Sequence, residues 1–504
     1  MLATVPSATL FGVLGVGVIV EVHVARGLPG FTVVGLPDTS CRESRDRVRA
    51  ALLTSGFAWP DKRTTVNLAP TSVRKIGSAL DLAIAIGVLV ASEQLSPAAV
   101  EGRAFLGELG LDGTLRHVPG VLPIIEAIET SEIIVPPSSV HEASLLGGRT
   151  VRCARDLRQL VDALTAEAPW PRPPDPPFDL SVAAVPELAE VRGHQLARRA
   201  LEIAAAGGHN LLMVGPPGAG KTMLAQRLGG LLPDLDDALA LEATRVHSAA
   251  GSLPPGGLIR RPPWRAPHHG TSAVAMVGGG SQRLRPGEIS LAHGGVLFLD
   301  ELGEFSSVVL DALRQPLEEG VIRIARAETR VEVPADFLLV AAMNPCPCGE
   351  GVTPAACRCT DRALDRYRRR VSGPLLDRFD LRLDVHRPDP RALLHGDDAE
   401  STAQVAARVR AVRARSRRRG VTTNAGLGGA ALEREAPLSA EAGELLHRAL
   451  ESGRLTARGL RRIWRVALTI ADLAEHEGPL GAEHVASAFH LRADPGFLRG
   501  SSAP

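Results

Sequence analysis

The chain has 504 residues, more than one hydrophobic core usually supports, so we expect about two to four domains. Hydrophobic residues make up 45% of the sequence and charged residues 22%, which supports folded material throughout, and the 3% of aromatic residues leaves aliphatic side chains to build the cores. The formal net charge of +1 neither supports nor excludes a nucleic-acid partner, because only the charge distribution could. The apolar N-terminal segment lacks a basic start and contains Pro6, so we expect a cytoplasmic protein with no signal peptide or membrane span.

The first 165 residues alternate between strand and helix signals and predict a mixed α/β domain without a nucleotide site. Asp38 or Thr39 is expected to cap a helix with a charged outer face. The other expected elements are strands at 19–24, within 27–38 and at 64–68, and an apolar helix at 77–90. A proline-rich stretch follows, and residues 166–186 are predicted to form a stiff extended linker.

The next segment has the pattern of a phosphate-binding loop. An apolar strand at 209–214 leads into the loop, and a helix is expected at 223–232. Backbone N–H groups in such a loop surround the β-phosphate, the lysine reaches the β- and γ-phosphates, and the threonine hydroxyl can bind Mg²⁺. The predicted nucleotide-binding residues are Gly215, Pro216, Pro217, Gly218, Ala219, Gly220, Lys221 and Thr222.

A second motif, which is acidic, indicates that the site of this loop hydrolyses the nucleotide. Residues 294–299 form an apolar run typical of a strand buried on both faces of a parallel sheet, and the run ends in Asp300 and Glu301. Asp300 is expected to hold Mg²⁺ through water, and Glu301 to polarise the water that attacks the γ-phosphate. Two acids at a strand end can also be a simple solvated terminus, and the phosphate-binding loop favours the catalytic interpretation.

Several segments resemble the N-terminal domain of the YifB/ComM family of magnesium-chelatase-like AAA+ ATPases: residues 27–38, 42–49, 66–70 and 77–87. The resemblance covers essentially the whole chain. It implies an α/β multidomain protein with a Lon-protease-like N-terminal domain to residue 165, a linker at 166–186, an AAA+ core with a parallel sheet at 187–390 and a C-terminal helical lid at 391–500. In a Lon-type protease a nucleophilic serine would stand at Ala79, so the dyad is absent. Ser78 beside Lys75 is an alternative nucleophile, although a capping role for Ser78 is favoured.

Two further stretches resemble segments that this family directs toward the pore of its ring. The first, at 260–270, contains the adjacent pair His268 and His269, for which loop packing or substrate contact is favoured over metal binding because neighbouring side chains diverge. The second, at 321–333, alternates apolar and charged residues and predicts a β-hairpin. Its arginines, Arg323, Arg326 and Arg330, could contact a polyanion in the channel or form a solvated face.

The strand expected at 337–344 ends at Asn344, which matches the polar sensor of AAA+ proteins that holds the attacking water or the γ-phosphate. Four of the six cysteines follow it: Cys346, Cys348, Cys357 and Cys359. Cysteines so closely spaced in a long chain suggest a metal cluster in a reducing compartment rather than a disulfide framework. The spacing can bring four thiolates to one tetrahedral ion, so a structural Zn²⁺ is predicted, with an iron–sulfur cluster or free thiols as alternatives.

By resemblance, Arg378 in the segment 372–381 is the arginine finger donated to a neighbouring subunit, which implies an oligomer, expected as a hexameric ring. A salt bridge to Asp377 or Asp380 is the alternative. Arg458 matches the second sensor arginine, with Arg461 as its substitute. A helix at 405–419 carries seven arginines and no acid, which suits DNA phosphates or a subunit interface: Arg408, Arg410, Arg413, Arg415, Arg417, Arg418 and Arg419.

The resemblance implies a ring-forming ATPase that uses ATP and Mg²⁺ to move along DNA, with a role in branch migration during homologous recombination and DNA uptake. The residues themselves support ATP hydrolysis, whereas the DNA substrate follows from the resemblance alone. The alternative is the motor subunit of a magnesium chelatase, although nothing in the sequence provides a porphyrin site. An ATP-fuelled protease is disfavoured by Ala79.

Overall fold

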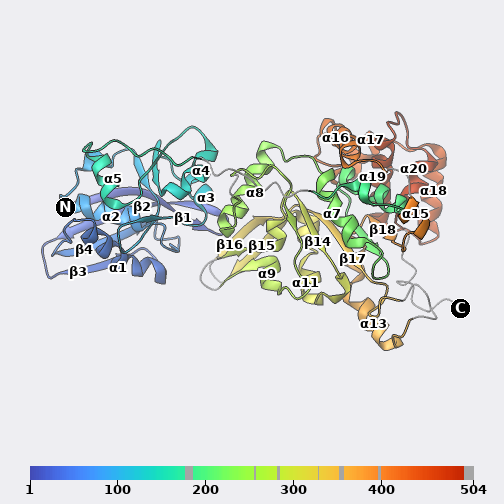
Figure 1. Cartoon of the computed structure of the whole chain (residues 1–504), viewed down its shortest axis with the longest axis horizontal. Helices are drawn as coiled ribbons and strands as arrows, with labels where there is room; N and C mark the ends of the chain where they lie inside the picture. Colours follow the sequence, from blue (N-terminus) through green and yellow to red (C-terminus); the bar gives the residue numbers. More distant parts are fainter. Residues whose placement is uncertain are drawn as a thin grey trace.

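The computed structural model describes residues 1–175, 185–254, 257–280, 284–326, 329–350, 357–395 and 399–492. Figure 1 shows an elongated molecule with the N-terminal α/β domain at one end and a helical lid at the other. Between them lies the motor, the domain expected at residues 187–390. Residues 176–184 of the expected linker lie outside the described residues. Within the described residues no helix is both long and apolar enough to cross a membrane.

The N-terminal domain begins with a four-stranded sheet of order β1-β2-β4-β3, on which the fully buried α2 packs. The expected capping of α1 is confirmed, since the Asp38 carboxylate accepts a hydrogen bond from the backbone N–H of Cys41 at 2.8 Å. The first elements are β1 (Leu2–Phe11), β2 (Leu14–Ala25), β3 (Gly30–Val34), α1 (Thr39–Thr54), β4 (Arg63–Ala69) and α2 (Asp81–Ala91). A second part contains β5 (Arg103–Phe105), β6 (Glu108–Leu109), β7 (Leu115–Arg116), α3 (Val121–Glu126), β8 (Glu132–Val135), α4 (Val140–Ala143), β9 (Thr150–Cys153) and α5 (Leu157–Leu164).

One strand of this domain was not predicted, and one expectation was wrong. Strand β1 was missing from the prediction, and it tolerates Pro6 because it lies at the edge of the sheet, where one side of the strand needs no ladder partner. Ser78 does not cap α2, whose N-terminal residue Leu80 makes no side-chain cap. The Ser78 hydroxyl donates instead to Glu108, while the buried Lys75 ammonium donates to the carbonyl of Pro70. Ser78 and Lys75 therefore have separate partners and do not form a hydrogen-bonded dyad.

The motor contains a five-stranded parallel sheet of order β11-β14-β17-β10-β18. Its residues alternate between two cores: Leu211 and Met213 face the core shared with the lid, and Leu212 and Val214 face the opposite core. The elements are α6 (Gln195–Gly207), β10 (Leu211–Val214), α7 (Lys221–Leu231), α8 (Asp237–Ala250), β11 (Trp264–Arg265), α9 (Ala273–Val277), β12 (Gly278–Gly279), β13 (Arg285–Pro286), α10 (Glu288–Leu291), β14 (Val296–Leu299), α11 (Ser307–Ala312), α12 (Pro316–Glu319), β15 (Val321–Arg326), β16 (Thr329–Pro334), β17 (Leu338–Met343), α13 (Asp361–Arg370), α14 (Gly373–Leu376) and β18 (Leu381–Asp384).

The hairpin expected near residue 321 is confirmed as the antiparallel pair β15 and β16. Residues 307–319, whose sequence pattern predicts a single helix, form two helices, α11 and α12. Pro316 stands at the first turn of α12, where the missing N–H is tolerated, but it could not have continued α11.

The lid is entirely helical in the described residues and consists of α15 (Pro390–His395), α16 (Thr402–Arg418), α17 (Gly429–Glu435), α18 (Ala440–Glu451), α19 (Ala457–Leu473) and α20 (Ala482–His490). Helix α16 begins with a capping box formed by Ser401 and Gln404 and packs against α6, α7 and α19. The lid and the motor therefore share one hydrophobic core across the sheet face that carries the phosphate-binding loop.

The N-terminal domain packs against α8 and the hairpin of the motor (Figure 1). One hydrophobic cluster joins Leu10 and Ile124 of the N-terminal domain to Val246 in α8 and Val331 in β16. Polar contacts surround this cluster. The Glu126 carboxylate pairs with Arg245, and the buried Glu142 carboxylate accepts hydrogen bonds from Ser248 and from the N–H of Leu122. The hairpin expected to project into a ring channel is thus covered on one side by its own N-terminal domain.

Candidate active site

The phosphate-binding loop joins β10 to α7 at the carboxyl edge of the parallel sheet. Gly218 and Gly220 have left-handed backbone conformations, with φ of +76° and +83°, which glycine adopts without a Cβ clash. Gly220 immediately precedes α7, so the positive N-terminus of this helix faces the loop. A Cβ on Gly215 would lie 2.0 Å from the carbonyl oxygen of Val385, so only glycine fits at the start of the loop.

Lys221 lies inside the loop and points toward the sensor strand. Its Nζ donates to the carbonyl oxygens of Gly215 and Pro216 at 2.7 and 3.0 Å, and to Oδ1 of Asn344 at 3.0 Å. Burial lowers the pKa of Lys221, and the nearby carboxylates of Asp300 and Glu301 oppose this shift. The structure therefore brings the predicted lysine, sensor and acids to one place.

Thr222 and Asp300 face each other across the same cavity, with Thr222 Oγ1 donating to Asp300 Oδ2 at 2.7 Å. The hydroxyl of Thr222 and the carboxylate of Asp300 thus lie side by side, and oxygen donors of this kind suit the Mg²⁺ predicted from the two motifs.

Glu301 directly follows β14 and its turn, and it has an unusual backbone conformation, with φ of +53°. Its carboxylate is 53% exposed, and its Oε2 lies 3.2 Å from Nδ1 of His269. His269 also stacks on His268, with 4.0 Å between the ring centroids. The histidine pair belongs to no group of metal-ligand geometry within the described residues. The contact between His269 and the candidate base was not foreseen, because its two ends come from separate motifs.

Two adjoining cavities form the site. The first, of about 450 Å³, is lined by the phosphate-binding loop together with Asp300, Glu301, Met343 and Asn344. The second, of about 700 Å³, shares Gly218 to Gly220 with the first. Sequence reasoning missed most of its lining, which comes from segments before α6 and after β18: Glu190, Arg192, His194, Arg387, Pro388, Asp389, Pro390 and Leu393. The only sequence signal was the segment around His194 at the start of the motor.

The four cysteines predicted to bind metal lie together beside the nucleotide site, with their sulfur atoms all within 4.8 Å of one another. The Sγ of Cys346 is 3.3 Å from that of Cys348 and 3.8 Å from that of Cys357, and Cys348 and Cys357 are 3.8 Å apart. Tetrahedral Zn²⁺ with Zn–S bonds of about 2.3 Å requires sulfur separations of about 3.8 Å, so the donor set fits Zn²⁺.

The two nearest thiols of this cluster differ in acidity. Hydrogen bonds from the backbone N–H groups of Glu350 and Arg358 lower the pKa of Cys348 to about 6, so this cysteine is readily a thiolate. Burial raises the pKa of Cys346 to about 12. The residue after Cys348 also touches the phosphate-binding loop, since a Cβ on Gly349 would lie 2.5 Å from Cγ of Pro217. The turn that carries the first two cysteines therefore packs against the loop.

Arg378 lies just after α14, and its side chain is held within its own chain. Its guanidinium pairs with Glu318 at 2.5 Å and donates to the carbonyls of Arg314 and Pro374. The alternative expectation of a salt bridge to Asp377 or Asp380 was wrong. Asp377 pairs instead with Arg492, and Asp380 with Arg462. Arg378 does not line the nucleotide cavity of its own chain.

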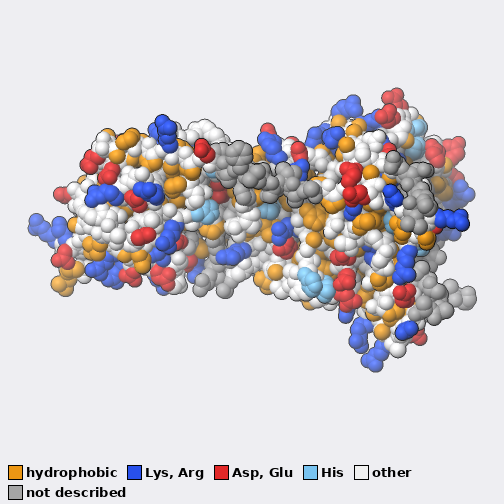
Figure 2. Space-filling view, viewed as in Figure 1, with side chains coloured by type: hydrophobic (Ala, Val, Ile, Leu, Met, Phe, Trp, Pro, Cys, Tyr) orange, Lys and Arg blue, Asp and Glu red, His pale blue; other side chains and the backbone are white. Residues whose placement is uncertain are grey.

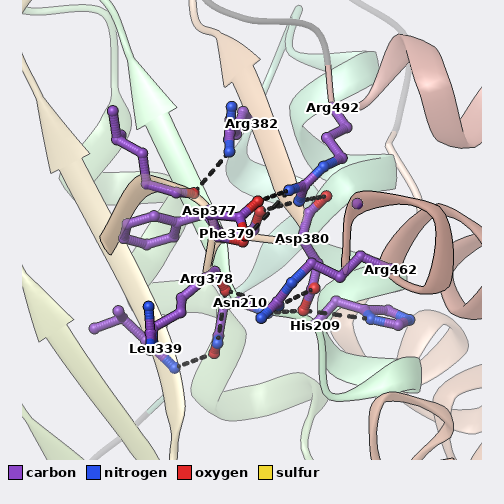
Figure 3. Close-up of polar contacts among 12 residues, drawn as sticks. His209, Asn210, Leu339, Asp377, Arg378, Phe379, Asp380, Arg382, Arg462 and Arg492 are labelled. Carbon is purple, nitrogen blue, oxygen red and sulfur yellow. Dashed lines mark hydrogen bonds and ion pairs between the residues drawn. The ribbon is translucent and has the colours of Figure 1, made fainter. Parts of the chain in front are cut away.

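Asp380 is the centre of the network in Figure 3. Its carboxylate accepts from Nη1 of Arg462 at 2.6 Å and from the backbone N–H of Asn210 at 3.2 Å, and it lies 3.7 Å from Nδ1 of His209. Burial disfavours the charged carboxylate, but the contacts with His209 and Arg462 outweigh it and hold the pKa of Asp380 below its ordinary value. Asp380 thus ties α19 of the lid to the start of β10, and both Arg462 and Asn210 also donate to the carbonyl of Arg378.

The remaining arginines have varied surroundings. Arg458 and Arg461 are exposed, and neither lines the cavities described above. Much of the basic face expected on α16 is directed inward: Arg408 pairs with Glu202 and Glu400, Arg413 donates to the carbonyl of Ala205, and Arg415 and Arg419 pair with Asp472. In the hairpin, Arg323 pairs with Glu319 and Glu332, whereas the side chains of Arg326 and Arg330 lie outside the described residues.

Together, the glycine loop, the acidic strand end and the polar sensor on neighbouring parallel strands, with a helical lid over the same sheet, define a AAA+ P-loop ATPase core. Three family models match the chain: magnesium chelatase, subunit ChlI, over residues 187–393; subunit ChlI of Mg-chelatase over 20–139; and magnesium chelatase, subunit ChlI C-terminal, over 399–492.

Similar proteins match along nearly the whole chain. The competence protein ComM of Haemophilus influenzae is 44% identical over 98% of this chain and 97% of its own length. YifB of Escherichia coli is 43% identical over the same shares, and an uncharacterised protein of Mycobacterium tuberculosis is 45% identical over 96% of this chain and 97% of its own length. The chain belongs to the YifB/ComM family of magnesium-chelatase-like AAA+ ATPases. Membership implies ATPase activity with ATP and Mg²⁺.

Proposed function

We propose that this chain is a subunit of a ring-forming, cytoplasmic ATPase that moves along DNA and drives branch migration. The similarity to a competence protein over 98% of this chain carries the DNA assignment, because it covers the N-terminal domain as well as the motor. The geometry of the nucleotide site supports the ATPase part of the proposal.

In this proposal the larger cavity holds the nucleoside and the loop cavity holds the phosphates. Lys221 balances the charge of the β- and γ-phosphates, and the amide of Asn344, beside the lysine, orients the attacking water. Thr222 and Asp300 hold Mg²⁺, which supplies charge neutralisation on the phosphates when bound. The Glu301 carboxylate accepts the proton of the water as it attacks the γ-phosphorus.

We further assign Arg378 to the transition state of a neighbouring subunit and a structural Zn²⁺ to the cysteine cluster. Arg378 must exchange its ion pair with Glu318 for the neighbouring phosphate, so ring assembly has to reposition it. The four sulfur atoms already have a spacing suited to Zn²⁺.

The test measures ATP turnover at low salt without DNA, with duplex and with a four-way junction. We expect DNA to stimulate turnover independently of its sequence, and the junction to be resolved by wild type but not by Glu301→Gln. A different result would favour the second candidate, the motor of a magnesium chelatase, which the names of the three matching family models suggest. That motor should ignore DNA and respond to a porphyrin-binding partner.

A further inference from the structure

Helix α13, which directly follows the cysteine cluster, carries a row of unpaired arginines on its outer face. Arg362, Arg366 and Arg369 are exposed, and the structure gives none of them a hydrogen bond or an ion pair within its described residues. Their spacing of four and three residues places them on one side of the helix, roughly opposite the buried Tyr367. Figures 1 and 2 show α13 projecting from the motor, with basic side chains gathered at its tip.

Several of the basic side chains that sequence reasoning singled out are bound to acids or carbonyls of the same chain: Arg323 in the hairpin, Arg408, Arg413 and Arg415 on α16, and Arg419 at its C-cap. Arg410, Arg417 and Arg418 on α16 are exposed and, like the row on α13, have no partner among the described residues. On α13 itself Asp361 and Asp365 are exposed, but neither forms an ion pair with an arginine that the structure describes. The guanidinium groups of this row are therefore available to an external anion.

The inner face of α13 is tied to the nucleotide site. The Tyr367 hydroxyl donates to the carbonyl of Asn344 at 3.1 Å, and its ring fills the space where a Cβ on Gly303 would stand. Arg370 donates to the carbonyl of Gly303 and pairs with Glu304, in the turn just after the candidate base Glu301. Helix α13 therefore connects its outer face to the sensor Asn344 and to the turn that follows Glu301.

We propose that the row Arg362, Arg366 and Arg369 binds the phosphates of a nucleic-acid strand and that α13 transmits this contact to the ATPase site. The inference rests on the proposed DNA motor and names its contact surface. Along a helix rising 1.5 Å per residue the row spans about 10 Å, a length over which one strand of duplex DNA presents about three phosphates. No large apolar side chain on α13 is exposed, which disfavours a protein partner because protein interfaces need apolar anchors.

The test compares two triple variants with the same loss of charge. R362Q/R366Q/R369Q removes the row, and R42Q/R45Q/R49Q removes three exposed arginines of similar spacing on α1, far from the motor. Glutamine retains the helix propensity of arginine. We expect the α13 variant to bind duplex DNA about tenfold or more weakly and to lower the slope of log affinity against log salt by about 3, while its DNA-free ATP turnover stays at the wild-type level. The α1 variant should match wild type.

The outcomes separate this inference from the proposed function. If the α13 variant binds DNA as tightly as wild type does, the assignment of this arginine row to DNA is wrong, and the proposed DNA motor still stands. Equal losses in both triple variants would also overturn it, because bulk charge would then explain the effect. Wild type that binds no DNA at low salt would overturn both proposals. An α13 variant that no longer assembles, measured by light scattering, would make the row a subunit contact and overturn its assignment to DNA.

A second variant tests the transmission step. Tyr367→Phe removes the hydrogen bond to the carbonyl of Asn344 and keeps the ring over Gly303. We expect this variant to bind DNA with wild-type affinity and to lose most of the stimulation of ATP turnover by DNA. Stimulation equal to that of wild type would show that α13 binds DNA without acting on the site through this bond.

Discussion

Lys221 and Glu301 line the same cavity but carry separable parts of the reaction. Lys221→Ala removes the charge that faces the phosphates, so we expect nucleotide affinity to fall about 100-fold, which corresponds to the loss of about 3 kcal/mol from a charged hydrogen bond. Glu301→Gln keeps the shape of the side chain and removes only the base, so binding should persist while turnover falls about 100-fold or more. Nucleotide titration and steady-state ATPase assays measure the two effects. Normal turnover in Glu301→Gln would remove the base from the mechanism.

Asp380 gives a prediction about stability and pH. Because its pKa is depressed in the folded chain, the stability that it contributes is present above its unfolded pKa of about 3.9 and is lost as the pH falls through the lower folded value. Asp380→Asn leaves Arg462 without its charged partner, and we expect a loss of about 3 kcal/mol. Denaturant unfolding at several pH values should give a constant difference between wild type and variant from about pH 5 to 8, and a smaller one below about pH 4. A difference that disappears between pH 8 and 6 would assign the titration to another group.

At this scale the sequence predicted the residues of short motifs but not their partners. Lys221, Asp300 and Asn344 were recognised because each stands at a fixed place after a strand. The contact of Glu301 with His269, the ion pair of Arg378 with Glu318 and the bond between Asn210 and Asp380 join distant segments, the last pair being 170 residues apart. No periodicity or spacing carries such information. The structure supplies it by placing strand ends side by side.

Among the elements, the cysteine cluster yields the clearest prediction. We expect the purified protein to contain about one Zn²⁺ per chain, and Cys357→Ser to lose the metal and to unfold at a lower temperature, because the bound ion holds thiolates that would otherwise repel one another. Elemental analysis and thermal unfolding measure the two effects. Cys153→Ala is the control, since this buried cysteine lies outside the cluster and should not change the zinc content. Iron, or no metal after purification with a reductant, would contradict the assignment.

The elements that the sequence predicted best have a strong local period. The alternation of apolar and charged residues in β15 and β16 and the uninterrupted apolar runs of β14 and β17 were recognised for this reason. Prolines behave differently in two elements. Strand β1, which was not predicted, contains Pro6 at the edge of its sheet, whereas Pro316 begins a new helix where the apolar pattern alone predicted one continuous helix. Whether a proline is tolerated depends on the side of the element that faces a partner, which a single strand or helix pattern does not reveal.

At the scale of the whole molecule, the packing of the N-terminal domain on the hairpin couples the movements of these two parts. Val331 of β16 lies against Gly12, where an added Cβ would be 2.6 Å from a methyl group of the valine. A hairpin held this closely cannot move without the N-terminal domain, so a shift in the motor during ATP hydrolysis must be carried to that domain or must break the contact. The sequence predicted both the N-terminal domain and the hairpin but not their contact. Apolar residues that pack between two domains cannot be told, from sequence alone, from apolar residues inside each domain.

The assembly itself is tested through Arg378. Arg378→Ala rings should bind ATP but hydrolyse it about 1000-fold more slowly, the order expected for the loss of an arginine that acts in trans. Mixing them with Lys221→Ala subunits should restore part of the activity, because some interfaces then pair an intact Lys221 with an intact Arg378 of the neighbour. Glu318→Gln is the control for structure: it removes the ion pair but leaves the guanidinium, and should hydrolyse ATP nearly as wild type does. If mixed rings form and show no recovery at any ratio, or if Glu318→Gln is as inactive as Arg378→Ala, then Arg378 acts only as a structural residue of its own chain.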